Sequence, residues 1–221
     1  MNILVPRRAH LEIEIVHDLV CPWCYLGVRR LLQTLKRRRD HTYELTWRPF
    51  LLNPDMPRSG ISHTEYAIRK FGGEDRAKRL NLSIAEIGNA EGVAFRFDLI
   101  RRTPSSVDAH RLVKLGERHG VATEIVEAVF AAHFCEGRDI GDIEALAEIA
   151  TKCGVDARTA RLYLLSDADT DGIHLENLRA HRLGINGVPC FIIGGQHAIA
   201  GAQECEVLER LLDVATVSLH P

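Results

Sequence analysis

A pair of cysteines stands where an alternating segment gives way to an apolar one, and this placement constrains the fold more than any other feature of the chain. Residues 11–16 alternate apolar and acidic side chains, which predicts a β-strand. Cys21 and Cys24 follow shortly after it. The segment from about 22 to 38 predicts a helix, and Pro22 suits its first turn because an N–H would have no partner there.

Further strands are predicted on both sides of the middle of the chain. Residues 42–47 alternate and are rich in β-favouring side chains, so strand, helix and strand in close succession predict a parallel pair with a right-handed crossover. The later predicted elements are a helix at 174–183, an apolar strand at 189–193, a tight turn at 194–195, a return strand at 196–200 and a helix at 204–214. These elements complete a sheet that the first unit begins.

The middle of the chain has a different character. Residues 60–172 contain no convincing strand and form a series of predicted helices with recognisable ends. Ser62 with Glu65 predicts a capping box, and Asp142 predicts a second helix start. Glycines follow the apolar periodic stretches, at the position beyond a helix end that glycine favours: Gly72, Gly92, Gly120, Gly137 and Gly154.

The order of these elements predicts an α/β protein in which a βαβ…αββα sheet domain is split by an all-helical insertion. The predicted bounds are 10–58 and 173–216 for the two parts of the sheet domain and 59–172 for the inserted domain. A chain of 221 residues can bury a core of this size without disulfide staples.

The two neighbouring cysteines favour redox chemistry. Thiolate is the nucleophile in disulfide exchange, and a helix N-terminus stabilises an anion. Cys21 would occupy that N-terminus as the exposed attacking thiol, with Cys24 one turn further in as the resolving thiol. The other four cysteines form no second pair, whereas a structural zinc site normally takes four ligands, so no metal is expected.

The composition excludes several function classes. A formal net charge of −2 gives no support to nucleic-acid or anionic-membrane binding, and the basic run 36–39 is expected to complement a helix C-terminus. No stretch has the length of a membrane span, and Arg7 and Arg8 are not followed by the apolar region of a signal peptide. We therefore expect a cytoplasmic protein whose cysteines are mostly reduced.

Five short motifs, in one order along the chain, carry a resemblance to a known family. They are VHDLVCPWCYLG at 16–27, RPFLLNP at 48–54, DAHR at 108–111, GVP at 187–189 and AGAQ at 200–203. Together they resemble the DsbA family of thioredoxin-fold oxidoreductases, and within it the FrnE-like branch. The resemblance extends from about residue 11 to 214.

That resemblance implies a thioredoxin fold with a helical domain inserted after the second strand, and a substrate groove between the two domains. It implies that Val188 and Pro189 form a cis-proline loop facing the dithiol. By the same similarity the backbone of Val188 offers hydrogen bonds to an extended peptide or to glutathione, and Pro22 and Trp23 also contact the substrate.

The chain departs from many thioredoxin-fold enzymes at the position of their buried acid. That acid lies on the first strand, six residues before the nucleophile, and Ile15 stands there instead. Asp18 is the nearest candidate to accept the proton of Cys24, and capping of the strand end is its alternative role. His17 could stabilise the Cys21 thiolate as a cation, unless the strand turns its ring away.

Other candidate groups are expected to be structural. Cys190 should pack inward as a small strand residue. Five further histidines have no spacing that would place two of them on one helical turn: His110, His119, His133, His174 and His181. Five phenylalanines should belong mostly to the core, with some of them lining a groove: Phe50, Phe95, Phe97, Phe130 and Phe134.

Three functions remain open at this point. The first is a dithiol oxidoreductase or isomerase acting on protein or low-molecular-weight disulfides, with no bound cofactor and with glutathione as a candidate redox partner. The second is a glutathione-dependent isomerase or transferase, as in the related hydroxychromene carboxylate isomerase and kappa-class glutathione transferase, in which Cys21 only positions the thiol cofactor. The third is a non-catalytic, chaperone-like binding module. Those isomerase and transferase relatives usually have serine in place of Cys21, so the presence of both sulfurs favours the first.

Overall fold

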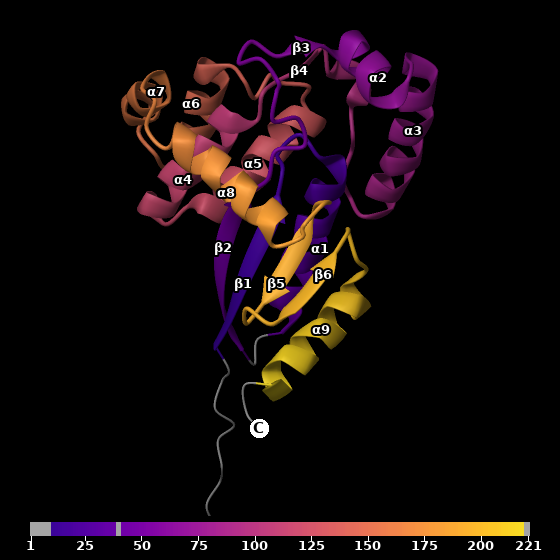
Figure 1. Ribbon diagram of the computed structural model, residues 1–221, viewed down its shortest axis with the longest axis vertical. Helices are drawn as coiled ribbons and strands as arrows, with labels where there is room; N and C mark the ends of the chain where they lie inside the picture. Colours follow the sequence, from indigo (N-terminus) through magenta and orange to yellow (C-terminus); the bar gives the residue numbers. More distant parts are fainter. Residues whose placement is uncertain (1–9, 39–40, 219–221) are drawn as a thin grey trace, which may run out of the picture.

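A four-stranded mixed sheet lies at one end of the molecule, with strand order β2–β1–β5–β6 (Figure 1). The structure is a computed structural model that describes residues 10–38 and 41–218. Strand β1 (His10–His17) pairs in parallel with β2 (Thr42–Pro49), as the strand–helix–strand pattern predicts. Strand β5 (Cys190–Ile193) runs antiparallel to β1, and β6 (His197–Ala200) runs antiparallel to β5.

The two faces of the sheet are covered by different helices. Alternation along β1 turns Ile13 and Ile15 toward the main core, which also contains residues of α1 (Pro22–Arg37) and α9 (Cys205–Ser218). Val16 faces the other way, into a small cluster with Ala180 of α8 (Thr170–Arg182). Helix α8 therefore closes the face opposite α1 and α9 (Figure 1).

The remaining helices gather at the other end of the molecule (Figure 1). They are α2 (His63–Phe71), α3 (Glu74–Ala90), α4 (Val107–His119), α5 (Ala122–Phe134), α6 (Ile143–Lys152), α7 (Ala157–Leu165) and the 3₁₀ helix η1 (Phe97–Leu99). None of the described residues between 61 and 165 joins the four-stranded sheet. The domain bounds proposed from the sequence stay a prediction, and α8 crosses the one at residue 173.

One expectation for this region is wrong. A two-residue strand β3 (Ile61–Ser62) pairs antiparallel with β4 (Arg102–Thr103), although the sequence predicts no strand between 60 and 172. The backbone N–H of His63 adds a hydrogen bond to Arg101 O at 3.0 Å. Two residues are too few to produce a detectable alternation, so only the folded chain reveals this ribbon.

The predicted helix ends are mostly confirmed. Ser62 Oγ accepts a hydrogen bond from Glu65 N at 3.1 Å, and Asp142 Oδ1 accepts one from Glu144 N at 3.1 Å. Gly72 and Gly120 adopt the left-handed conformation directly after α2 and α4, where a side chain would be strained.

The basic run at the end of α1 is described only in part. Lys36 and Arg37 lie in the last helical turn, and Arg38 ion-pairs with Asp213 of α9. Arg39 falls outside the described residues, as do Arg7 and Arg8.

Arg111 of α4 hydrogen-bonds the end of α7 and the link between α7 and α8. Its guanidinium lies 2.6 Å from Asp108 Oδ1 and is almost fully buried. It also donates to four backbone carbonyls, those of Tyr163, Leu164, Ser166 and Ala168, at 2.6–3.1 Å. These carbonyls lie at the C-terminal end of α7 and just beyond it, where helical partners are missing. One buried side chain thus bonds two of the last carbonyls of α7 and two carbonyls of the link that follows.

Candidate active site

Cys21 is the residue that opens helix α1. Its backbone is extended (φ −101°, ψ 112°), and its carbonyl accepts the first helical bonds, from Cys24 N at 3.0 Å and Tyr25 N at 3.2 Å. Pro22 follows at the first helical position, and the first turn contains no acidic side chain. The sulfur therefore lies at the positive end of the helix dipole, as the sequence predicts.

The two sulfurs have different surroundings. The Cys21 thiol donates to Val188 O across a 3.8 Å contact, and Cys24 is completely buried behind it. The backbone N–H of Asp18 donates to Cys24 Sγ at 3.5 Å. Burial and the neighbouring Cys21 raise the pKa of Cys24 well above its usual value. Cys24 is thus the thiol whose deprotonation requires a neighbouring base.

The expectation of an exposed attacking thiol is wrong. Cys21 is only 5% exposed, while Trp23 beside it is 40% exposed. The sulfur lies against Val188, Cys21 lines a groove, and the other groove walls come from distant parts of the chain. A substrate disulfide must therefore enter the groove to reach it.

The loop opposite the dithiol contains a cis peptide bond between Val188 and Pro189. Helix α1 approaches this loop through Gly27, where a Cβ atom would lie 2.7 Å from Pro189 Cγ and 3.3 Å from a ring atom of Phe191. Only the absence of a side chain at position 27 permits this packing. The distance between the dithiol helix and the loop thus depends on one glycine.

The groove beside Cys21 has a volume of about 370 Å³ and mostly apolar walls. It is lined by Val20, Pro22, Trp23 and Val188 near the sulfur and by residues of α2 and α3 farther out. The main apolar wall residues are Leu52, Phe71, Ile84, Phe97, Ile100 and Phe134.

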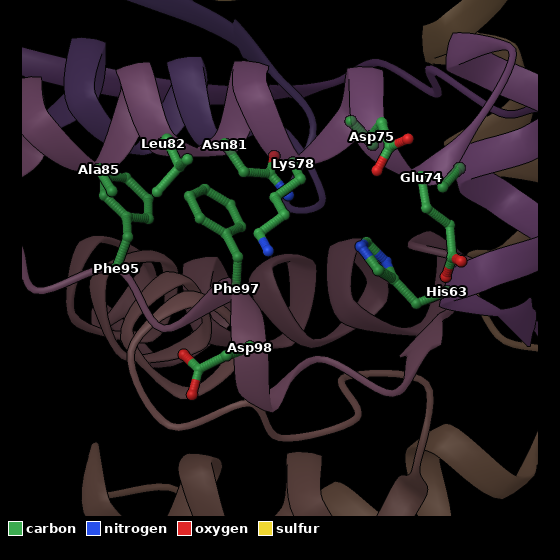
Figure 2. A pocket seen from close by; sticks show the side chains of 12 residues that line it. His63, Glu74, Asp75, Lys78, Asn81, Leu82, Ala85, Phe95, Phe97 and Asp98 are labelled. Carbon is green, nitrogen blue, oxygen red and sulfur yellow. The ribbon is translucent and has the colours of Figure 1, made fainter.

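A second cavity of about 540 Å³, shown in Figure 2, adjoins this groove. Both are lined by His63, Asn81 and Phe97. Lys78, Glu74 and Asp75 of α3 line it (Figure 2). Of the five phenylalanines singled out above, Phe97 and Phe134 line the groove and Phe95 lines the second cavity, while Phe50 and Phe130 are buried in the cores.

Asp18 caps the loop between β1 and α1. Its carboxylate accepts from Leu52 N at 2.7 Å and from Val20 N at 3.3 Å, and His110 Nε2 lies 3.6 Å from its Oδ1. Burial alone would raise the pKa of Asp18, but His110 and the Leu52 N–H outweigh it, so the pKa is lowered and the carboxylate stays charged. The capping role of Asp18 is thereby confirmed, and its role as a proton partner stays a prediction.

His17 cannot serve as a cation near Cys21. Burial and the neighbouring His110 lower the pKa of His17 to about 3. Its Nδ1 donates to Ile15 O at 3.2 Å, and its ring packs on Trp47. The end of strand β1 therefore turns the His17 ring inward, and the ring does not stabilise the Cys21 thiolate as a cation.

Comparison with known proteins identifies the family. The family model described as "DSBA-like thioredoxin domain" matches residues 12–213. This chain belongs to that family. The thioredoxin fold predicted from the sequence is therefore confirmed, and the chain is a thiol–disulfide oxidoreductase in the general sense of the DsbA family. The match agrees with the resemblance to its FrnE-like branch.

Three individual proteins are similar over most of the chain. The uncharacterized protein YwbO of Bacillus subtilis (strain 168) is 25% identical over 203 residues, 91% of this chain and 96% of that protein. The crystal structure of probable DsbA oxidoreductase SCO1869 from Streptomyces coelicolor is 29% identical, with a TM-score of 0.86 and coverage of 96% and 92%. The cytosolic disulfide reductase DsbM from Pseudomonas aeruginosa with GSH is 20% identical, with a TM-score of 0.62 and coverage of 94% and 96%, and shares the fold.

Sequence reasoning missed His110 as part of this site. The motif at 108–111 contributes to the resemblance, but its histidine was expected to be structural only. In the folded chain its ring lies beside Asp18 and packs edge-on against His17 at 5.1 Å. No local pattern could bring α4 to the dithiol loop, so the motif was the single available signal.

Cys190 packs inward, as expected. It is 5% exposed and lies in the small cluster with Val16, Phe50 and Ala180. Within the described ranges, no three histidine, cysteine or acidic side chains come together in a way that could hold a metal ion. No helix of the described part is long and apolar enough to cross a membrane.

Replacing Gly27 with alanine is expected to push the cis-proline loop away from the dithiol. The new methyl group must move Pro189, which should cost about 1–3 kcal/mol of unfolding free energy as overpacking. Activity should fall at least about tenfold, because a displacement of about 1 Å at a reacting centre can cost about 10²-fold. Urea unfolding and disulfide-reduction kinetics of the variant measure both effects.

Gly172→Ala is the matched control. Gly172 also lies within a helix, but nothing lies within 4 Å of the position of its Cβ. Alanine there should stabilise the protein by up to about 1 kcal/mol and leave activity unchanged. Equal stability and activity of Gly27→Ala and Gly172→Ala would contradict the packing role of Gly27.

Acid should destabilise the folded protein before its carboxylates are titrated. Burial lowers the pKa of His17 to about 3 and that of His133 to about 4, from an ordinary value of 6.5. Below pH 6.5 these rings bind protons in the unfolded chain but not in the folded chain. The contribution of the two neutral rings to the free energy of unfolding is therefore fully present above pH 6.5 and is lost as the pH falls toward 4.

Urea unfolding from about pH 7 to pH 4 tests this expectation. His133→Gln should reduce the slope of stability with pH, because a glutamine amide can still donate to Arg138 O, the 3.2 Å partner of His133 Nδ1, but does not titrate. The exposed His119→Gln should leave the slope unchanged. A slope that is the same in all three proteins would contradict the assignment.

Proposed function

We propose that Cys21 and Cys24 exchange disulfides with protein or low-molecular-weight substrates that enter the apolar groove. One observation carries the proposal. Cys21 Sγ lies at a helix N-terminus and 3.8 Å from the Val188 carbonyl, both residues line that groove, and the neighbouring Cys24 is completely buried.

The first step is attack by the Cys21 thiolate on one substrate sulfur. A mixed disulfide forms, the substrate disulfide breaks, and the second substrate sulfur leaves as a thiolate that takes a proton from solvent. Cys24 then attacks Cys21 Sγ and forms the Cys21–Cys24 disulfide, which releases the substrate as a dithiol. The enzyme loses two electrons to the substrate, and the same steps in reverse oxidise a substrate dithiol.

Substrate contacts are proposed for Pro22 and Trp23 on the dithiol side and for Val188 and Pro189 on the loop side. All but Pro189 line the groove, and the partly exposed indole of Trp23 offers a flat apolar surface in its wall. The Val188 carbonyl, which contacts the Cys21 sulfur, is the backbone group proposed to hydrogen-bond an extended substrate.

Glutathione is the low-molecular-weight partner we propose, in the cytoplasm. The similar structure of the cytosolic disulfide reductase DsbM with GSH supports both points. A role limited to positioning glutathione, as in an isomerase or transferase, would give no function to the sulfur of Cys24. The buried position of that sulfur behind Cys21 therefore favours disulfide exchange.

Reduction of insulin disulfides tests the proposal. The protein should accelerate the reduction of insulin by dithiothreitol, followed by turbidity, and should also accept glutathione with glutathione reductase as a source of electrons. No acceleration with either reductant would overturn it. Suppression of aggregation of a cysteine-free client without any thiol turnover would instead support the chaperone-like module.

A further inference from the structure

His110 lies buried behind the dithiol and takes no part in the exchange steps above. It belongs to α4, far from the cysteines in sequence, and its side chain is fully buried. Neither of its ring nitrogens has a hydrogen-bond partner among the described residues. Buried polar atoms of this kind are rare in folded proteins and call for an explanation.

Asp18 lies in contact with both His110 and the resolving cysteine. Its Oδ1 lies 3.6 Å from His110 Nε2, and its backbone N–H donates to Cys24 Sγ at 3.5 Å. The carboxylate is held in place by the N–H groups of Leu52 and Val20 and carries a negative charge. An imidazole and a charged carboxylate thus lie side by side next to the resolving cysteine.

Cys24 needs such a neighbour. It is completely buried, and burial raises its pKa well above the usual value, so solvent cannot easily remove its proton. The position where many thioredoxin-fold enzymes have a buried acid is occupied by Ile15, which is fully buried in the core. The proton of Cys24 therefore requires a different acceptor.

We propose that the Asp18–His110 pair accepts the proton of the Cys24 thiol when Cys24 attacks the mixed disulfide. In this step the Cys24 S–H bond breaks and the proton ends on His110, as an imidazolium beside the Asp18 carboxylate. The Cys24–Cys21 bond forms, and the bond from Cys21 to the substrate breaks. The substrate sulfur leaves with the electron pair and takes a proton from solvent.

His110 is the final proton acceptor in this scheme, and Asp18, which contacts both His110 and Cys24, is the residue that positions the pair. The inference rests on the proposed function and adds the acceptor that this function lacks.

Two other histidines of the same cluster do not compete for this proton. The other titratable groups of the cluster are His17 at the end of β1, Cys21 and Cys24 at the start of α1, Tyr66 of α2 and His133 of α5. His17 packs against His110 but has a pKa of about 3, and His133 has a pKa of about 4, so neither holds a proton near neutral pH.

Single-turnover reaction of the reduced protein with 5,5′-dithiobis(2-nitrobenzoate) isolates the step. Attack by Cys21 releases one thionitrobenzoate and leaves the second on Cys21, and attack by Cys24 then releases the second. Stopped-flow absorbance separates the two, because the first phase depends on reagent concentration and the second does not. The other four thiols are replaced by serine in every protein of the series: Cys135, Cys153, Cys190 and Cys205.

His110→Phe keeps an aromatic ring but removes the acceptor. We expect its second phase to be at least about tenfold slower at neutral pH, because general bases contribute about 10²–10⁴-fold. Its first phase should be unchanged, and its second phase should approach that of the parent at high pH, where hydroxide replaces the base. His119→Phe, at the exposed end of the same helix, should match the parent in both phases.

A second phase of His110→Phe equal to the parent's at every pH would overturn the inference, and so would a uniform slowing that high pH does not restore. If His110→Phe does not fold, the pH profile of the parent decides. The rate of its second phase should level off at high pH, and a tenfold rise per pH unit with no plateau would contradict the pair as acceptor. A parent protein with no second release at all would instead refute the proposed function.

Discussion

Cys21→Ser should lose all disulfide-reducing activity, whereas Cys24→Ser should stop half-way and retain its substrate covalently. Serine at position 21 removes the nucleophile at the helix N-terminus, so insulin reduction should fall to the uncatalysed rate. Serine at position 24 leaves that nucleophile intact but removes the group that attacks the mixed disulfide. Non-reducing gels and intact-mass spectrometry should show the Cys24→Ser protein linked to its substrate through Cys21.

Cys153→Ser is the matched control for both variants. Cys153 is a partly buried free thiol just beyond α6, away from the groove, and its loss should leave turnover and mass unchanged. Full turnover by Cys24→Ser with glutathione would contradict the role of the resolving thiol and favour the glutathione-dependent isomerase or transferase. Residual turnover by Cys21→Ser would contradict the assignment of the attacking thiol.

Arg111→Met should be the most destabilising single change considered for this chain. Methionine fills a similar volume, but it leaves the carbonyls of Tyr163, Leu164, Ser166 and Ala168 and the carboxylate of Asp108 without the bonds that Arg111 donates. Removing one partner of a buried ion pair typically costs about 3–5 kcal/mol. Urea unfolding should show a decrease of that size in the free energy of unfolding. The structural cause is the loss of the bonds that hold the α7–α8 link against α4.

Arg118→Met provides a control on the same helix. Arg118 also lies over the Tyr163 ring and ion-pairs with Asp169, but its side chain is 55% exposed, against 1% for Arg111. An exposed ion pair contributes at most about 1 kcal/mol, so this variant should be nearly as stable as the parent. Similar losses in the two variants would show that the buried bonds of Arg111 are not what stabilises this region.

The dithiol helix could be predicted from the sequence because its causes are local. An alternating strand, a cysteine at the helix start and Pro22 at the first helical position need no information from elsewhere in the chain. The capping residues Ser62 and Asp142 were found for the same reason, since each bonds an N–H two or three residues away. The resemblance to the DsbA family then predicted the thioredoxin fold around these elements, and the family model that matches residues 12–213 confirmed that fold.

The features that could not be predicted depend on contacts between distant segments. The prediction that Cys21 is exposed was wrong because the groove walls beside it include α2, α3 and the segment ending at Val188. The charge of His17 could not be known without its burial beside Trp47, and His110 could not be placed beside Asp18 without the path of α4. In each case the local sequence gives the type of side chain, whereas packing between distant segments determines its exposure, its charge and its neighbours.

The contact between Cys21 and Val188 also has a consequence for biosynthesis. The two residues are 167 positions apart, so the dithiol leaves the ribosome long before the loop that faces it. At about 5–20 residues per second, that delay is roughly ten to thirty seconds. During that interval a nascent chain displays two unshielded thiols, and the enzyme acquires its selectivity only after Val188 has been translated and has packed against Cys21.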